Sequence, residues 1–223
     1  MAAEPPVPTT RPEPCSISIA GSAPVLSKKP LRHPPITAIP LWQKNKYFFV
    51  KTKINTQELL TIIDQLADQL LASYPDADRT VLVGIQQGGV VVSNLIHQSL
   101  IKKTKGKTFD HGQLDITFYR DDVRNKILAP DTMHLPFDIE GKTVILVDDV
   151  LFTGRTIKAA LDALFDYGRP DRVKLCVLVD RPEHRQFPIQ ADHAGQVIKA
   201  QRSDKLKLRV NEQGEAALLL ISE

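Results

Sequence analysis

VILVDDVLFTGRT, residues 144–156, is the stretch that decides the fold of this chain. Its four leading apolar residues run directly into Asp148 and Asp149, which is typical of the carboxyl end of a buried parallel strand. Thr153–Thr156 then begin a segment whose apolar residues recur at helical spacing. Because ligands of open α/β sheets bind beyond the carboxyl ends of the strands, we expect a binding site at this turn.

The residue types in this run suit a sugar phosphate. Two adjacent carboxylates at a strand end repel each other and lose hydration, so a sugar diol or a metal-bound ligand is an expected partner. Backbone amides at a helix start, together with the hydroxyls of Thr153 and Thr156, favour a phosphate group. Ordinary strand-end acids and a capping threonine explain either element alone, but not the whole run. Other phosphate motifs fail: there is no G-x-x-x-x-G-K-[ST], and Gly84, Gly88 and Gly89 do not form G-x-G-x-x-G.

Outward from this run, predicted strands and helices alternate. Apolar runs and alternating patterns predict strands at residues 80–85, 114–119, 143–150, 172–180, 197–201, 205–210 and 216–222, the last two as a hairpin. Helical spacing predicts helices from a capping box at Asn55 and Glu58 to about Tyr74–Pro75, from 90 to about 101, and from 157 to 165. The predicted fold class is α/β, with a twisted, mainly parallel sheet covered by helices on both faces.

Charge and composition divide the chain near residue 50. The net charge is +3, but residues 1–50 hold six Lys/Arg against two Glu, so the remainder is close to neutral. Ten of the 16 prolines lie in the first 40 residues, which lack a periodic apolar pattern. We therefore predict a Pro-rich, largely disordered N-terminal extension over residues 1–50 and one domain over residues 51–223. A transit peptide is the alternative interpretation of the extension, because it contains few acids.

Features that the sequence lacks indicate the cellular compartment of the protein. No apolar run approaches the ~18 residues that a membrane span needs. Cys15 and Cys176 cannot by themselves form a disulfide framework or a four-ligand zinc site, and the six histidines lack ligand spacing. We therefore expect a cytoplasmic protein without membrane association.

VILVDDVLFTGRT resembles the phosphoribosyl diphosphate (PRPP) signature of type I phosphoribosyltransferases. Together with LDITFYRDDV (114–123), LPFDIEGK (135–142) and VLVDRPEHRQFPI (177–189), it is similar to the PyrR family of pyrimidine-operon attenuators and uracil phosphoribosyltransferases. The resemblance covers the chain from about Thr56 to its end. It implies a type I phosphoribosyltransferase-like fold with a small hood, formation of UMP and diphosphate from uracil and PRPP, Mg²⁺ carried by PRPP, a regulatory role, and a homodimer or higher homo-oligomer.

The resemblance also implies the site residues. Arg120, Asp148 and Asp149 would be catalytic, the two acids holding the ribose hydroxyls while Thr153–Thr156 hold the 5′-phosphate. The PRPP site would comprise Val144, Ile145, Leu146, Val147, Asp148, Asp149, Val150, Leu151, Phe152, Thr153, Gly154, Arg155 and Thr156. The diphosphate and substrate contacts would come from Gln87, Gly88, Gly89, Arg120, Arg124 and Arg181. No direct protein ligand to a metal is implied. Each of the three arginines has an alternative interpretation as a solvated or ion-paired surface residue.

Three positions depart from the related sequences or distinguish among them. The family often has T-R-G in the diphosphate turn, whereas this chain has Gln87-Gly88-Gly89, so weak turnover is expected. The connection after Arg181 is one residue longer, at Pro182-Glu183. Purine-type relatives place a carboxylate at position 152. Phe152 can only stack on or enclose a small pyrimidine, which disfavours hypoxanthine and guanine as substrates.

Two other functions stay open. One is an RNA-binding attenuator that binds a pyrimidine-operon mRNA leader, and the other is a nucleotide sensor with little or no turnover. The candidate RNA-binding residues are basic side chains in two patches: Lys102, Lys103, Lys105 and Lys107, and Lys199, Arg202, Lys205, Lys207 and Arg209. The near-neutral body and the lack of an aromatic RNA motif place the transferase first.

Overall fold

A five-stranded parallel sheet forms the centre of the protein. The structure is a computed structural model that describes residues 49–106, 108–119 and 135–222. The strand order is β3-β2-β4-β5-β6. The strands are β2 (Thr80–Ile85), β3 (Asp110–Leu114), β4 (Thr143–Leu151), β5 (Arg172–Asp180) and β6 (His193–Val197). Because β4 is central, the turns that follow β2 and β5 end on either side of it.

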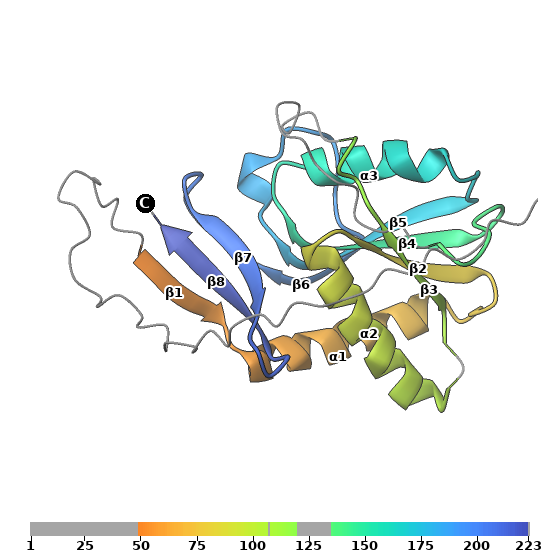
Figure 1. The fold of residues 1–223 in the computed structure, drawn as a ribbon, viewed down its shortest axis with the longest axis horizontal. Coiled ribbons are helices and arrows are strands. Elements are labelled where there is room, and N and C mark those ends of the chain that lie inside the picture. Colours follow the sequence, from red (N-terminus) through yellow and green to blue (C-terminus); the bar gives the residue numbers. More distant parts are fainter. Residues whose placement is uncertain (1–48, 107, 120–134, 223) are drawn as a thin grey trace, which may run out of the picture. The chain divides into compact units, whose positions relative to one another are not determined.

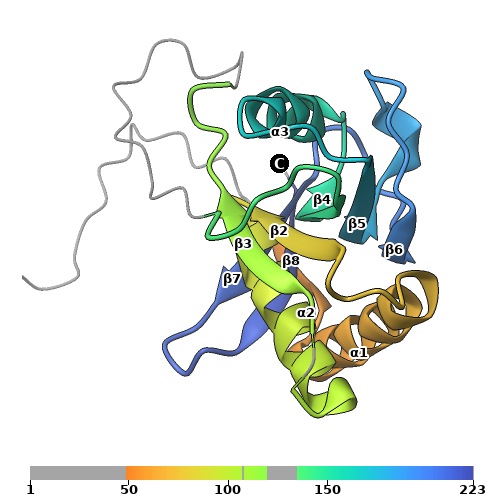
Figure 2. The same cartoon turned by 90° about the vertical axis from the view of Figure 1, so that its right-hand side faces the viewer.

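Helices cover both faces of this sheet, as predicted. Helices α1 (Thr56–Ser73) and α2 (Gly88–Thr104) lie on one face, and α3 (Arg155–Phe165) lies on the other (Figures 1 and 2). Each face has its own buried core. The first is built from residues such as Leu66, Ile96 and Ile145, and the second from residues such as Leu146 and Leu164. Continuous apolar strands are therefore required, because successive side chains enter opposite cores.

Local sequence signals fix the first helix. The Asn55 side chain accepts a hydrogen bond from the Glu58 amide at 2.9 Å, and the Glu58 carboxylate accepts one from the Asn55 amide at 3.1 Å. This confirms the predicted capping box, a feature that contributes about 1 kcal/mol. The helix ends at Ser73, shortly before Pro75, which confirms the predicted end. No helix among the described residues has the length and apolar character to cross a membrane.

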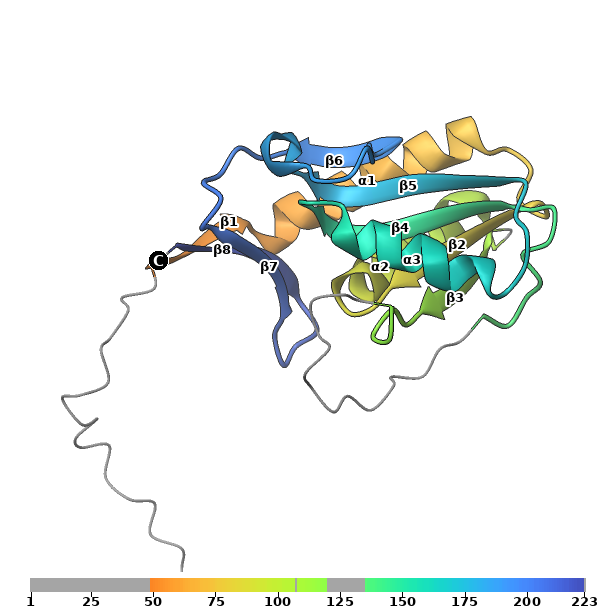
Figure 3. The same cartoon turned by 90° about the horizontal axis from the view of Figure 1, so that it is seen from above.

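A second, antiparallel sheet forms the predicted hood. It has the order β1-β8-β7 and consists of β1 (Phe49–Ile54), β7 (Lys205–Val210) and β8 (Ala216–Ser222). The pairing of β7 with β8 confirms the predicted C-terminal hairpin. This sheet lies beyond the carboxyl end of β4 (Figure 3), where β7 comes against the residues that follow the apolar run.

Three sequence predictions need correction. The strand predicted at 114–119 is wrong, because β3 ends at Leu114 and residues 117–119 form a turn in which the Thr117 amide donates to Asp115. The strand predicted at 197–201 is displaced, since β6 ends at Val197. Strand β1 was not predicted: three of its six residues are Lys51, Thr52 and Lys53, and it is held by pairing with the distant β8.

Candidate functional site

Asp148 and Asp149 lie at the carboxyl end of β4. Asp148 is 5% exposed, and its carboxylate accepts a hydrogen bond from the Asp149 amide at 2.9 Å. The Asp149 carboxylate accepts from the Val150 amide, also at 2.9 Å. Burial raises the pKa of Asp149, while interactions with the Asp148 side chain and the Leu208 backbone amide act in the opposite direction. The two acids therefore lie side by side at a strand end, where burial disfavours the charged form of Asp149.

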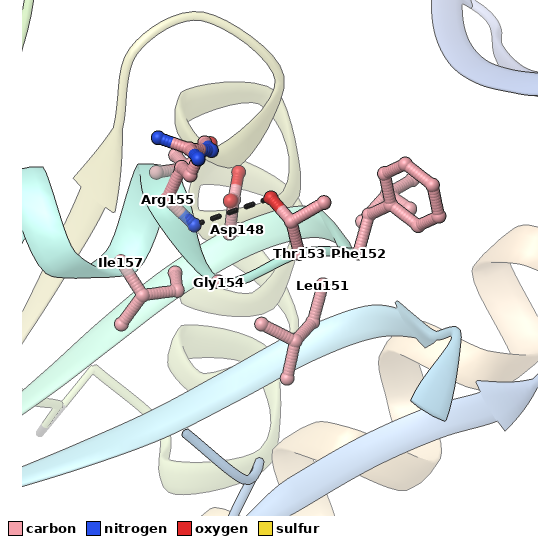
Figure 4. A pocket seen from close by; sticks show the side chains of 9 residues that line it. Asp148, Leu151, Phe152, Thr153, Gly154, Arg155 and Ile157 are labelled. Carbon is pink, nitrogen blue, oxygen red and sulfur yellow. Dashed lines mark hydrogen bonds between the residues drawn. The ribbon is translucent and has the colours of Figure 1, made fainter. Parts of the chain in front are cut away.

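One side of this pair opens into a pocket of about 230 Å³ at the start of α3 (Figure 4). Asp148 lines it together with residues 150–157. Gly154 adopts a left-handed conformation with φ of 89°, which lets the chain turn from β4 into the helix. The Arg155 amide donates to the Thr153 hydroxyl at 3.4 Å. Helix-start amides and threonine hydroxyls facing one small pocket form a suitable site for a phosphate.

The segment after β5 holds this loop in place. A short 3₁₀ turn, η1 (Pro182–His184), includes the extra residue noted in the sequence. Beyond it, the Arg185 guanidinium forms an ion pair with Asp180 and donates to the Phe152 carbonyl at 2.5 Å. The Gln186 amide donates to the Thr153 carbonyl at 2.9 Å. The sequence analysis missed the supporting role of this segment, because its contacts with Phe152 and Thr153 join residues more than 30 positions apart.

On the other side of the acid pair lies a larger pocket of about 430 Å³. It is lined by Asp149, the turn at the start of α2 and strand β7: Gln87, Gly88, Val91, Leu206, Lys207, Leu208 and Arg209. The turn contains a cis peptide bond between Gln86 and Gln87. A Cβ atom at Gly88 would overlap the Asp149 carboxylate, and one at Gly89 would overlap the Val147 carbonyl. Position 89 therefore requires glycine for close packing of the turn on β4, whereas a side chain at Gly88 would displace the Asp149 carboxylate.

The comparisons with known proteins agree with this geometry. Residues 52–204 match the family model of the phosphoribosyl transferase domain. The chain is 40% identical over 168 residues to the Bifunctional protein PyrR of Elusimicrobium minutum, covering 74% of this chain and 93% of that protein. It is 42% identical over 172 residues to the Bifunctional protein PyrR of Corynebacterium glutamicum, covering 75% and 88%. The chain belongs to the PyrR family of phosphoribosyltransferases.

Solved structures show the same fold for this PyrR-family chain. A hypoxanthine phosphoribosyltransferase from Staphylococcus aureus matches it with a TM-score of 0.55 and 21% identity, covering 68% of this chain and 78% of that one. At this identity the likeness concerns the fold alone. It confirms the predicted type I phosphoribosyltransferase-like α/β architecture.

Phe152 of the smaller pocket in this PyrR-family site is supported from behind by Arg181. Phe152 lines the pocket, and the Arg181 guanidinium carbon lies 4.3 Å from the centre of its ring. Arg181 is 2% exposed and donates to the carbonyls of Ala200, Gln201 and Asp204. Burial lowers the pKa of Arg181. Its nitrogen atoms therefore hold residues 200–204, which lead into β7 of the hood. Arg181 does not line either of the two pockets.

The other predicted site residues fall into four groups. Lys199 and Arg202 lie between β6 and β7, and Lys205, Lys207 and Arg209 lie on β7, where the last two line the larger pocket. Val144, Ile145, Leu146 and Val147 are fully buried in β4 and hold the signature in the core without lining either pocket. Lys102, Lys103 and Lys105 lie at the far end of α2, where Lys103 forms an ion pair with Asp68 at 2.8 Å. Lys107, Arg120 and Arg124 lie outside the described residues.

The donors available to a metal ion are few. Among the residues that the structure describes, no group of three or more His, Cys, Asp or Glu side chains is placed to hold a metal. The Asp148–Asp149 pair does supply carboxylate oxygens beside both pockets. Mg²⁺ is usually bound by one or two carboxylates together with substrate phosphates. The pair therefore fits a Mg²⁺ ion that arrives with a phosphorylated substrate.

Proposed function

We propose that this chain transfers the phosphoribosyl group of PRPP to uracil, forming UMP and diphosphate. The observation that carries the proposal is the position of Asp148 and Asp149 between two pockets, one at the start of α3 and one at the start of α2. A substrate with phosphates at both ends of a ribose matches this order: phosphate site, acid pair, second phosphate site. The resemblance to PyrR proteins supports uracil as the acceptor base.

Each part of the site has a defined role in this proposal. The ribose hydroxyls donate to Asp148 and Asp149, and the amides and hydroxyls of Thr153–Thr156 bind the 5′-phosphate. The backbone of Gln87–Gly89 binds the diphosphate, and the resemblance adds Arg120 and Arg124 as its expected contacts. Arg181 holds Phe152 against the base. Each role is assigned to named residues, so each can be tested by substitution of those residues.

The reaction needs positioning and charge stabilisation rather than a covalent nucleophile. The bond from ribose C1 to the diphosphate oxygen breaks with its electron pair leaving on diphosphate, while uracil N1 forms the new bond to C1. The N1 proton passes to solvent. The carboxylates of Asp148 and Asp149 stabilise the positive charge that develops on the ribose ring. Mg²⁺ bound to PRPP would neutralise charge on the diphosphate.

Phe152 supports a pyrimidine acceptor over a purine. Its ring contacts the Arg181 guanidinium and meets the His184 ring edge-on, with centroids 5.4 Å apart. The position therefore offers an aromatic surface that cannot exchange a proton with a purine nitrogen. Uracil should be a substrate, whereas hypoxanthine and guanine should give no nucleotide above background.

The deciding experiment is formation of UMP from labelled uracil, PRPP and Mg²⁺. Wild-type protein should form UMP, and Asp149→Asn should lower kcat/KM by at least about 100-fold, since a preorganised charge beside the reacting ribose is lost. Asp171→Asn is a matched control, because Asp171 pairs with Arg79 beyond the opposite end of the sheet. Measurable UMP binding by wild-type protein without UMP formation would instead support a nucleotide sensor.

A second function, binding of a pyrimidine-operon mRNA leader, is favoured by the word "bifunctional" in the names of the relatives. Lys102 and Lys103 lie in the last turn of α2, whereas Lys207 and Arg209 line a pocket at its first turn, and the 17 residues of the helix span about 25 Å. We propose that RNA contacts the patch of Lys102 and Lys103 and that UMP occupancy changes its affinity. Filter binding at physiological salt, with and without UMP, tests this, and Lys102→Gln should reduce RNA affinity without changing UMP formation.

We further propose the molecular context of this activity. The protein acts in the cytoplasm as a homodimer or higher homo-oligomer, with its transferase domain at residues 51–223 and an extension at residues 1–50. The family match beginning at residue 52 supports this boundary. Light scattering of the full chain and of a variant lacking residues 1–48 should give the same number of subunits, and both should have the same activity per subunit.

A further inference from the structure

The diphosphate turn carries no cation. Its residues Gln86, Gln87, Gly88 and Gly89 carry no positive charge. At Gly88, where the related turns often carry arginine, any side chain would meet the Asp149 carboxylate. A leaving diphosphate carries several negative charges, so backbone amides alone are a weak counterpart to it. Cations that stabilise the diphosphate at this turn would therefore have to come from another part of the chain.

Strand β7 brings two cations to the same pocket. Lys207 and Arg209 line the pocket of about 430 Å³ together with Gln87, Gly88 and Asp149. β7 is an edge strand, and the backbone amide of Leu208, which lies between the two cations, interacts with the Asp149 carboxylate. Residues two apart on a strand project to the same side. Among the described residues, neither Lys207 nor Arg209 forms a salt bridge, so their charges are not already neutralised there.

We propose that Lys207 and Arg209 bind the diphosphate group of PRPP and supply the positive charge that the turn lacks. This inference rests on the proposed transferase function and adds two substrate-binding residues to it. The Arg209 guanidinium can form paired hydrogen bonds to phosphate oxygens, and the Lys207 ammonium acts as a point charge. As the C1–O bond breaks, negative charge grows on the diphosphate, and these two cations stabilise it.

The same residues also belong to a basic patch that RNA could occupy. Lys205, Lys207 and Arg209 alternate along β7 and so lie on one side of it. Two features favour the diphosphate: the pocket is closed on its other side by a glycine turn at a helix start, and it contains Asp149 of the PRPP signature. A solvated RNA-binding strand would require neither feature.

The test compares diphosphate with a nucleotide that lacks it. The double variant Lys207→Gln, Arg209→Gln is assayed for the inhibition constant of diphosphate, the Kd of PRPP and the Kd of UMP. We expect the first two to rise about tenfold, which corresponds to the loss of about 1.4 kcal/mol, and the Kd of UMP to stay unchanged. Arg209→Lys, which keeps the charge, should retain most of the diphosphate affinity. Lys51→Gln, an exposed lysine on β1 of the same sheet, is the matched control.

The outcomes separate this inference from the function on which it rests. Wild-type protein that forms no UMP and does not bind PRPP would overturn both. Wild-type protein that forms UMP, with unchanged diphosphate inhibition in the double variant, would overturn the role of Lys207 and Arg209 alone. Loss of RNA affinity in the double variant with diphosphate inhibition intact would likewise overturn it and assign β7 to RNA.

Discussion

The buried guanidinium of Arg181 lies against the ring of Phe152, 4.3 Å from its centre, while its nitrogens donate to three backbone carbonyls of residues 200–204. One side chain thus positions both the aromatic wall of a pocket and the segment that leads into β7. Arg181→Lys should lower the free energy of unfolding by about 2 kcal/mol, because an ammonium cannot reach all three carbonyls. It should also raise KM for uracil more than KM for PRPP. Denaturant titration and steady-state kinetics check both effects.

Arg172→Lys provides the control for this prediction, because Arg172 is an exposed residue at the start of β5. It should change neither the unfolding free energy nor either KM. A stable Arg181→Lys protein with wild-type KM for both substrates would show that Phe152 does not need this support.

Gly88 is expected to be essential for activity rather than for stability. In Gly88→Ala the added methyl group displaces the Asp149 carboxylate, and a displacement of this kind should lower kcat/KM for PRPP by roughly 100-fold. The control is Gly106→Ala, at the other end of α2. Gly106 has φ of 101° and open space around it, so this change should cost about 1 kcal/mol of stability without affecting kcat/KM. Equal activity in the two variants would contradict the prediction.

A histidine pair predicts how stability depends on pH. His111 stacks on His97 with centroids 4.7 Å apart, and its Nε2 lies 3.0 Å from the Ser93 hydroxyl. Burial, reinforced by the neighbouring His97, lowers the pKa of His111 from 6.5 to about 4. The unfolded chain therefore binds a proton between these values when the folded chain does not. Stability should be complete above pH 6.5 and fall as the pH drops from 6.5 towards 4.

The measurement is the unfolding free energy at several pH values for wild-type protein and His111→Gln. The variant keeps a hydrogen-bonding side chain but cannot titrate, so its stability should depend less on pH over this range. Burial also lowers the pKa of His97 and His193, so part of the slope should persist in the variant. Identical slopes in the two proteins would show that His111 is not responsible.

Cys176 should be chemically inert in the folded protein. It lies in the middle of β5, is fully buried, and burial raises the pKa of its thiol to about 12. Since the thiolate is the reactive form, a Cys15→Ser variant should show almost no reaction with an aromatic disulfide reagent in native buffer. The same variant in denaturant should react with one equivalent. Rapid labelling under native conditions would mean that β5 opens locally.

The fold was predictable where a local pattern coincides with an element. The β4–α3 run and the Asn55 capping box both formed as expected, because their signals lie within a few residues. The alternation of Leu114–Tyr119 was misleading, since the same spacing occurs in a turn held by Asp115. Strand β1 carries no comparable signal, because pairing with β8 supplies what its own sequence lacks.

The candidate site, like the fold, was predictable from the sequence only in part. The placement of Asp148 and the Thr153–Thr156 loop beside one pocket could be predicted, since these residues are nearly contiguous. The neighbours of Asp149 on β7 could not, because more than 50 residues separate Asp149 from Leu208 and no periodicity connects them. The space around Gly88 is also a tertiary property. A missing arginine was visible in the sequence, whereas the contact of Gly88 with the Asp149 carboxylate was not.

The pairing of the first strand with the last has a mechanical consequence. Phe49 of β1 lies opposite Ser222 of β8, and among the strands of the described residues β7 pairs with β8 alone. A force that pulls the C-terminal end away from this sheet would separate β8 from β1 and β7 one residue pair at a time. It would not have to break many hydrogen bonds simultaneously. β7 would then lose its anchor beside Asp149 while the five-stranded sheet was still intact. A protein-unfolding machine that pulls on this end would therefore abolish the activity before it unfolds the five-stranded sheet.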